Sequence, residues 1–203
     1  MKFKWLLLPV ILLAIITFWP ASGPSFAPLA SDARILAFGD SLTQGVGAST
    51  GMDYPSQLQR MSGRAVINAG ISGETSAQGL TRFSRVLDEM APDLIILLEG
   101  GNDFLRNSSA AQVEANLAAM LAEAQRRDIP VVLIGVPQKS IWLETAPLYG
   151  QLAAQYQPLF IEDFLTELLK LSEVKSDAIH LNDDGYRRLA EHLYRRLQQA
   201  GAL

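Results

Sequence analysis

The chain has 203 residues, which is enough for one domain with a substantial hydrophobic core. Hydrophobic residues make up 49% of it and charged residues 19%, so the composition excludes a disordered protein and a membrane protein with many spans. It contains no Cys, which excludes a disulfide scaffold, a thiolate metal site and a lipid-modified cysteine anchor.

The amino-terminal segment has the composition of an export signal. Lys2 and Lys4 are its only charged residues, and residues 5–19 are almost purely apolar. A cleavable signal peptide needs small residues just before the cut, but the candidate positions here are followed by Pro24 or Pro28, which disfavours cleavage. As a helix the apolar run would extend only ~22 Å, short of the ~30 Å core of a bilayer unless the next residues join it.

We therefore expect residues 1–22 to be either a signal peptide or an N-terminal membrane anchor, in which residues 5–21 would contact the membrane. A buried core helix is a third alternative, disfavoured by Pro9 and by the absence of a polar face. Both export alternatives predict a periplasmic or otherwise extracytoplasmic protein. Residues 23–31, rich in Pro, Ser and Ala, form the predicted linker.

The predicted domain spans residues 32–203 and is acidic. Of the 17 basic residues in the chain only Lys2 and Lys4 precede it, so it carries 15 basic residues against 21 acidic ones, a net charge of about −6. Such a surface offers no electrostatic basis for binding nucleic acid, and no nucleic-acid partner is expected.

Within this domain, short apolar runs alternate with longer amphipathic segments. Strands are predicted at 35–38, 65–68, 94–98, 130–136 and 159–161, and helices at 55–61, 76–90, 113–127, 148–156 and from a cap at Asp183 or Asp184 to residue 199, with Gly201 as the stop. This alternation predicts an α/β fold with a parallel sheet between two layers of helices. Ligands of such sheets bind at the carboxyl ends of the strands.

Four polar clusters follow predicted strands or precede the last helix. They are residues 39–42 (Gly-Asp-Ser-Leu), residues 68–75, residues 100–103 (Gly-Gly-Asn-Asp) and residues 177–180 (Asp-Ala-Ile-His). Ser41, in the first cluster, has the position of a nucleophile at the end of a rigid strand. Taken alone, the same loop also fits an ordinary turn followed by a helix cap, so the assignment depends on the other clusters.

Acyl transfer by a serine needs a base, a group that orients the base, and donors for the developing oxyanion. The chain has two histidines, and His192 is expected on the solvated face of the last helix. His180 is predicted in a loop three residues after Asp177, a spacing at which a turn can bring the carboxylate to Nδ1 of the imidazole. The backbone N–H of Gly73 and the side-chain amide of Asn102 are candidate oxyanion donors.

Two other kinds of site are disfavoured. Thr43 stands where a Gly-x-Ser-x-Gly nucleophile elbow needs its second Gly, so an α/β-hydrolase proper is not expected. Residues 39–47 contain neither the Gly-x-Gly-x-x-Gly of a dinucleotide site nor the Lys-Ser/Thr pair of a P-loop.

In their order along the chain, the four clusters resemble the sequence blocks of the SGNH hydrolase superfamily, also called GDSL esterases and lipases. The resemblance extends over residues 34–200, and the second block resembles that of bacterial periplasmic arylesterases and thioesterase/lysophospholipase enzymes. It implies a three-layer α/β/α sandwich around a five-stranded parallel sheet, of flavodoxin-like type, with no metal and no organic cofactor. The family often has Gly between its Asp and His, where this chain has Ala178.

The resemblance also implies roles for residues of the four clusters. They are the nucleophile Ser41, the base His180, its partner Asp177, and an oxyanion hole formed by the N–H groups of Ser41 and Gly73 and the side chain of Asn102. The predicted function is hydrolysis of carboxylic (acyl, aryl or thio) esters through an acyl-enzyme, with lysophospholipase activity among the expected reactions. The expected partner is a small-molecule or lipid acyl ester. A carbohydrate O-deacetylase of the cell envelope and a non-catalytic envelope binding module are the alternatives.

The acyl pocket is the least explicit part of this prediction. Residues 137–147 contain an apolar Ile-Trp-Leu run, which is unusual for an exposed loop. We expect this run and the residues after Asn102 to line the pocket; the alternative is that they pack into the core beneath the loop. The candidate pocket residues are Asp40, Phe104, Leu105, Ile141, Trp142 and Leu143.

Overall fold

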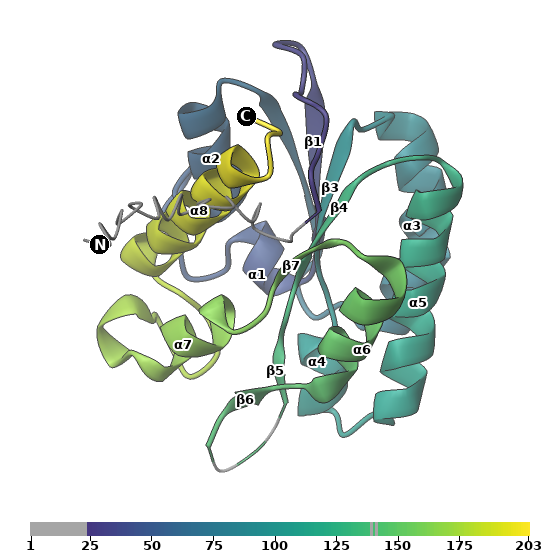
Figure 1. Cartoon of the computed structure of the whole chain (residues 1–203). Helices are drawn as coiled ribbons and strands as arrows, with labels where there is room; N and C mark the ends of the chain where they lie inside the picture. Colours follow the sequence, from purple (N-terminus) through teal and green to yellow (C-terminus); the bar gives the residue numbers. More distant parts are fainter. Residues whose placement is uncertain (1–23, 139, 141) are drawn as a thin grey trace, which may run out of the picture.

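A parallel sheet of five strands lies between two layers of helices in the computed structural model, which describes residues 24–138, 140 and 142–203 (Figure 1). The strands are β1 (Arg34–Gly39), β2 (Ala65–Gly70), β3 (Leu94–Leu98), β4 (Val131–Ile134) and β7 (Leu159–Ile161). Their order across the sheet is β2-β1-β3-β4-β7, and all neighbours are parallel. The predicted α/β/α sandwich is confirmed.

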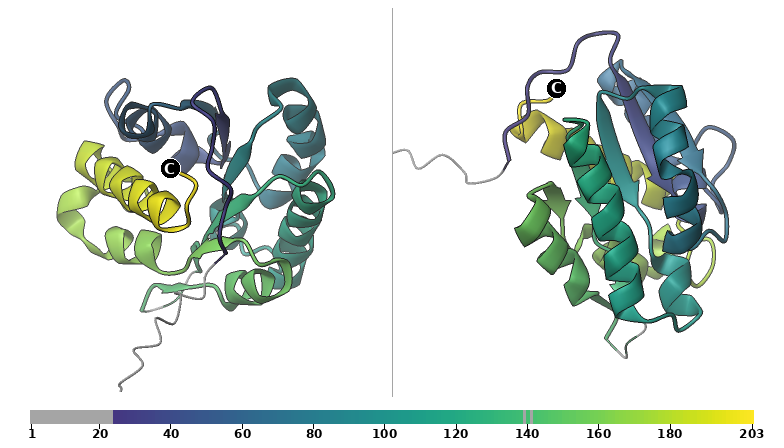
Figure 2. Two further views of the ribbon diagram at one scale, coloured as in Figure 1. Left: turned by 45° about the horizontal axis from the view of Figure 1, so that its top comes forward. Right: turned by 90° about the vertical axis from the view of Figure 1, so that its right-hand side faces the viewer.

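Helices cover both faces of the sheet (Figures 1 and 2). One layer holds α1 (Ser41–Gln44), α2 (Tyr54–Ser62), α7 (Phe164–Lys170) and α8 (Asp183–Gln199), and the other holds α3 (Ser76–Met90), α4 (Gly101–Leu105), α5 (Ala110–Arg126) and α6 (Pro147–Tyr156). A 3₁₀ helix, η1 (Ser172–Val174), follows α7, and β5 (Pro137–Gln138) pairs with β6 (Glu144–Thr145) in a small antiparallel ribbon.

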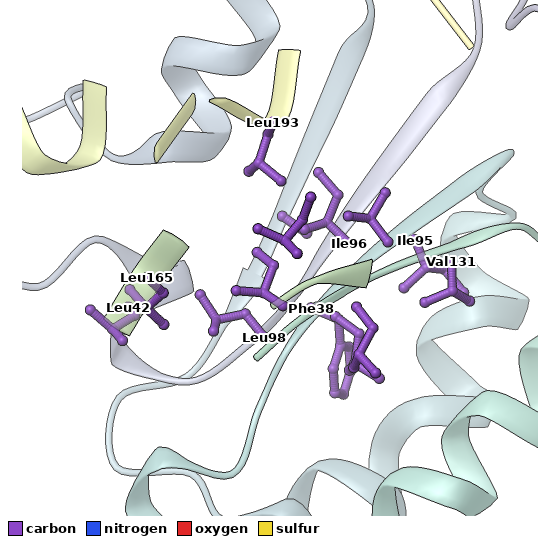
Figure 3. Packing of buried hydrophobic residues seen from close by; sticks show 14 of the residues in the cluster. Phe38, Leu42, Ile95, Ile96, Leu98, Val131, Leu165 and Leu193 are labelled. Carbon is purple, nitrogen blue, oxygen red and sulfur yellow. The ribbon is translucent and has the colours of Figure 1, made fainter. Parts of the chain in front are cut away.

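The core is continuous through the sheet. Every residue of β3 is buried, because a central parallel strand is covered on both faces. Figure 3 shows side chains of β1 and β3 packed with Leu165 of α7 and Leu193 of α8. On the opposite face, the ring of Phe38 meets that of Phe83 of α3 edge-on, with centroids 4.9 Å apart.

The amino end of α8 corrects one prediction. Its cap is Asn182, whose side-chain oxygen accepts hydrogen bonds from the N–H groups of Asp184 (3.0 Å) and Gly185 (3.1 Å). Asp183 and Asp184 instead occupy the first turn, where negative charge is favourable beside the helix dipole. The predicted stop is confirmed, since Gly201 follows the helix in the left-handed conformation, with φ 84°.

His192, predicted on a solvated face of α8, is half-buried. Its ring stacks on Phe164 of α7 with centroids 3.8 Å apart and planes 13° apart. Burial lowers the pKa of this histidine to about 4, so it stays neutral at ordinary pH. The expected solvation was wrong because sequence alone did not reveal α7 as a neighbour of α8.

The predicted linker packs against the domain where the structure describes it. Phe26 N–H donates to the carbonyl of Ala200 (2.8 Å), and Leu29 N–H donates to that of Ala202 (2.9 Å). The predicted signal peptide or anchor, residues 1–22 with the contact stretch 5–21, lies outside the described residues. Among the helices that the structure describes, none is long and apolar enough to cross a membrane.

Candidate active site

The first three polar clusters meet at the carboxyl edge of the sheet because their strands are adjacent and in register. Gly39, at the end of β1, pairs with Gly70 of β2 on one side and with Leu98 of β3 on the other. A side chain at Gly39 would collide with the sheet, since its Cβ would lie 2.1 Å from the carbonyl oxygen of Leu98. The glycine therefore permits β1 and β3 to approach closely just before Ser41.

The fourth cluster comes from the carboxyl-terminal part of the chain, and its histidine lies at the same edge of the sheet. His180 Nε2 lies 3.0 Å from Ser41 Oγ, and its Nδ1 lies 2.7 Å from Asp177 Oδ2. The second carboxylate oxygen of Asp177 accepts the backbone N–H groups of Ile179 and His180, both at 2.8 Å. These three contacts orient the carboxylate toward the imidazole.

The same contacts keep Asp177 ionised. The hydrogen bond with the His180 side chain is the main cause, and the backbone N–H of Ile179 adds to it, so the pKa of Asp177 falls from 3.8 to about 2. An ionised Asp177 accepts the Nδ1 proton of His180 and leaves Nε2 free to accept a proton from Ser41. Asp177, His180 and Ser41 thus form one hydrogen-bonded chain.

Asn102, in the first turn of α4, is held by two acceptors. Its Nδ2 donates to the carbonyl oxygen of Glu74 (2.9 Å) and to Asp40 Oδ2 (3.2 Å). Gly73, the residue before Glu74, has φ 78°, a left-handed conformation that favours glycine. Asn102 and Ser41 line the cavity described below, whereas Gly73 is not among the described residues that line it. Gly73 is linked to Asn102 through its neighbour Glu74.

Asp40, predicted as a pocket residue, lines the cavity but is almost fully buried and has structural partners. It caps α1 by accepting the N–H of Leu42 (3.0 Å), and its other oxygen accepts the amide of Asn102. Burial raises the pKa of Asp40 from 3.8 to about 6. Its contacts therefore place it as the support of Asn102 rather than as a free surface for substrate.

A cavity of about 200 Å³ opens beside Ser41 and His180. The apolar residues that line it include Phe104, Leu105, Val136, Leu143 and Leu169. Phe104, Leu105 and Leu143 are among the predicted pocket residues. Val136, which lies within a predicted strand, and Leu169, which lies on the unpredicted helix α7, are not.

The rest of the predicted apolar loop is placed differently. Trp142 has 77% of its surface exposed, and the described residues that line the cavity do not include it. Ile141 lies outside the described residues. Among those that are described, no cluster of three or more His, Cys, Asp and Glu side chains is arranged to hold a metal ion.

Comparison with known proteins points to one family. The model of the GDSL-like lipase/acylhydrolase family matches residues 37–188. Esterase TesA of Pseudomonas aeruginosa is 32% identical over 171 residues, which cover 79% of this chain and 85% of that protein. Thioesterase 1/protease 1/lysophospholipase L1 of Escherichia coli K12 is 28% identical over 204 residues, covering 97% of this chain and 93% of that protein. Among solved structures, that of AlinE4, an SGNH-hydrolase family esterase, superimposes with a TM-score of 0.66 at 34% identity, covering 85% of this chain and 98% of that one.

Proposed function

This chain belongs to the GDSL-like lipase/acylhydrolase family and is an ester hydrolase, and on that premise we propose that Ser41, His180 and Asp177 carry out a serine-esterase reaction. The observation that carries the proposal is the hydrogen-bonded chain from Asp177 through His180 to Ser41, at the mouth of an apolar cavity. Its substrates are small-molecule esters.

In the first half of the reaction, Ser41 Oγ attacks the ester carbonyl while His180 Nε2 takes its proton. The carbonyl oxygen gains negative charge, and the N–H groups of Ser41 and Gly73 with the amide of Asn102 stabilise it. His180 then gives the proton to the departing alcohol or thiol, which leaves Ser41 acylated.

In the second half, a water molecule attacks the acyl-enzyme. His180 takes a proton from the water and returns it to Ser41 Oγ, so the carboxylic acid leaves and the serine is restored. Asp177 holds the imidazole in one tautomer through both halves. The side chains of Phe104, Leu105 and Leu143 are the proposed wall for the acyl chain.

Carboxylic, aryl and thio esters, and lysophospholipids, are the proposed substrate range, in keeping with the names of the relatives. The O-deacetylase and binding-module alternatives have no relative among the similar proteins described above. For localisation we propose export across the cytoplasmic membrane, on the apolar sequence of residues 5–19. Cell fractionation of the full chain, followed by mass measurement of its amino terminus, distinguishes the anchored form from the cleaved one.

A fluorophosphonate probe and a panel of p-nitrophenyl esters, acyl thioesters and lysophospholipids test the activity. We expect stoichiometric labelling of wild type at Ser41 and hydrolysis of at least one ester class. Ser41→Ala should fold, take up no label and retain less than about one-thousandth of the activity, because loss of a triad nucleophile generally costs at least that much. Unchanged hydrolysis by Ser41→Ala would exclude this serine as the nucleophile.

A further inference from the structure

Arg82 of α3 is a nearly buried cation behind the candidate active site. Its side chain is 12% exposed, and its guanidinium lies over the ring of Phe38, 3.9 Å from the centroid. The reaction described above does not use it, and the described residues that line the cavity do not include it. A buried arginine needs acceptors for its N–H groups, so its partners show what it holds in place.

Those partners come from the ends of the two strands that lead into the site. Arg82 Nη2 donates to the carbonyl oxygen of Ala69 in β2 (2.8 Å) and more weakly to that of Gly39 at the end of β1 (3.4 Å). Ser41 follows Gly39 by two residues, and the loop bearing Gly73 begins just after Ala69. One guanidinium therefore ties the approach to the nucleophile to the approach to an oxyanion donor.

The same guanidinium also binds the loop that bears Gly73, through the side chain of Glu74. Arg82 Nε donates to Glu74 Oε1 (2.7 Å), and Nη2 pairs with Glu74 Oε2, so the ion pair is bidentate. The side chain of Glu74 is 5% exposed, so Arg82 compensates a buried charge. The carbonyl oxygen of Glu74 accepts the Asn102 amide at 2.9 Å, and Gly73 is its neighbour in the chain.

Glu99 lies close to Glu74 and adds no competing charge. Burial is the main cause that raises the pKa of Glu99 to about 10, so its carboxyl group is neutral in the folded protein. Arg82 is therefore the charged partner of Glu74, and the carbonyl oxygen of Glu74 accepts the Asn102 amide.

We propose that Arg82 is a positioning residue that fixes the Gly73 N–H and the Asn102 amide relative to Ser41, through its contacts with Glu74, Ala69 and Gly39. The inference rests on the proposed function, because it concerns the oxyanion donors of that reaction. Donors act on the transition state, and a displacement of about 1 Å can cost ~10²-fold in rate. Loss of Arg82 should therefore lower kcat and leave KM nearly unchanged.

The test compares Arg82→Met with Arg127→Met, using one p-nitrophenyl ester that the wild type hydrolyses. Arg127 is a matched control, because it also bridges two carboxylates from a partly buried position, those of Asp88 and Glu123, but it has no contact with the site. We expect kcat of Arg82→Met to fall ~10- to 100-fold with KM within about twofold. Arg127→Met should keep wild-type kcat and KM. A kcat of Arg82→Met within about twofold of wild type would overturn the inference.

A double-mutant cycle separates positioning from a general loss of structure. If Arg82 acts through the oxyanion donors, Arg82→Met should cost clearly less in the Asn102→Ala background than in the wild type, because one of those donors is already missing. Equal costs in both backgrounds would contradict the inference. The proposed function fails separately, through an active Ser41→Ala.

Arg82→Lys decides the matter if Arg82→Met does not fold. It keeps the positive charge beside Glu74, but a single ammonium cannot reproduce the fork that joins a carboxylate to two carbonyl oxygens. We expect it to fold, as checked by thermal unfolding, and to show a loss of kcat in the same range. A folded Arg82→Lys with wild-type kcat would overturn the proposal.

Discussion

His180 Nε2 and Ser41 Oγ lie 3.0 Å apart, although 139 positions separate the two residues in the sequence. Ser41 is fixed by the end of β1 and the start of α1, and His180 by a tight loop in which Ser176 N–H donates to its carbonyl oxygen at 3.0 Å. The distance therefore depends on the packing of the whole domain between them. Substitutions in either loop should therefore alter mainly the rate of the reaction.

Asp177→Asn should lower kcat by at least about tenfold, because an amide in place of the ionised carboxylate favours the wrong tautomer of His180. KM should change little. Asp184→Asn is the control, since Asp184 is a partly exposed carboxylate of α8 that pairs with Arg187 and Arg188. Steady-state kinetics of both variants make the comparison. Wild-type kcat in Asp177→Asn would remove this residue from the triad.

Asn102→Ala should reduce kcat by ~10²-fold or more with little change in KM, because an oxyanion donor acts mainly on the transition state. Gln112→Ala offers a control that removes an amide elsewhere on the same side of the sheet, where it donates to Asn116. A change confined to KM would instead assign Asn102 to binding of the substrate in its ground state.

Leu105→Ala should impair hydrolysis of octanoyl esters more than that of acetyl esters. Leu105 lines the cavity, and each methylene that loses a buried contact forfeits roughly 0.8 kcal/mol, or about fourfold in kcat/KM. Trp142→Ala should not lower octanoyl hydrolysis more than acetyl hydrolysis, because that side chain is exposed and is not among the described residues that line the cavity. A selective loss of octanoyl hydrolysis in Trp142→Ala would show that the loop between β5 and β6 covers the acyl chain.

Glu99→Gln should gain stability relative to the wild type as the pH rises. Burial raises the pKa of Glu99 from 4.5 to about 10, so the folded protein binds a proton that the unfolded chain releases above pH 4.5. This group therefore favours folding most below pH 4.5, and that contribution is lost as the pH rises toward 10. The glutamine does not titrate, so the difference in Tm between variant and wild type should grow between about pH 5 and 9.

A control for this pH dependence is Glu89→Gln, which removes an exposed carboxylate paired with Arg85 on the surface of α3. Its difference in Tm from wild type should change much less over the same range, because exposed ion pairs contribute little. A difference in Tm for Glu99→Gln that stays constant with pH would mean that Glu99 is ionised in the folded protein.

Sequence patterns predicted the long helices and strands well where the hydrophobic pattern alone determines the structure. The unbroken aliphatic run of 94–98 is β3 residue for residue, and the amphipathic segment 76–90 is α3. The cap of α8 was misplaced because Asn182, Asp183 and Asp184 are all good capping residues, and composition does not choose among neighbours. Helix α7 was missed because seven residues are too few to display a helical period.

For the candidate site too, sequence patterns predicted the locally determined residues but not the contacts that depend on tertiary packing. Residues adjacent to a predicted strand or turn, such as Ser41 and Asp177, could be named from sequence because their chemistry and spacing are local. The supporting contacts could not, since Arg82 reaches Ala69 and Glu74 only after α3 packs on the sheet. The exposure of Trp142 likewise depends on tertiary structure, which the apolar composition of its neighbours in the sequence does not reveal.

The packing of Phe26 and Leu29 against Ala200 and Ala202 has a practical consequence for handling the enzyme. This segment runs into the amino end of β1, whereas Ser41 follows the carboxyl end of the same strand (Figure 1). The chain contains no native cysteine, so a single thiol introduced at the exposed Ala27 would be a unique point of attachment. In protein immobilised through that thiol, the amino end of β1 would lie toward the support. The mouth of the cavity, near the carboxyl end of β1, would remain open to the surrounding solution.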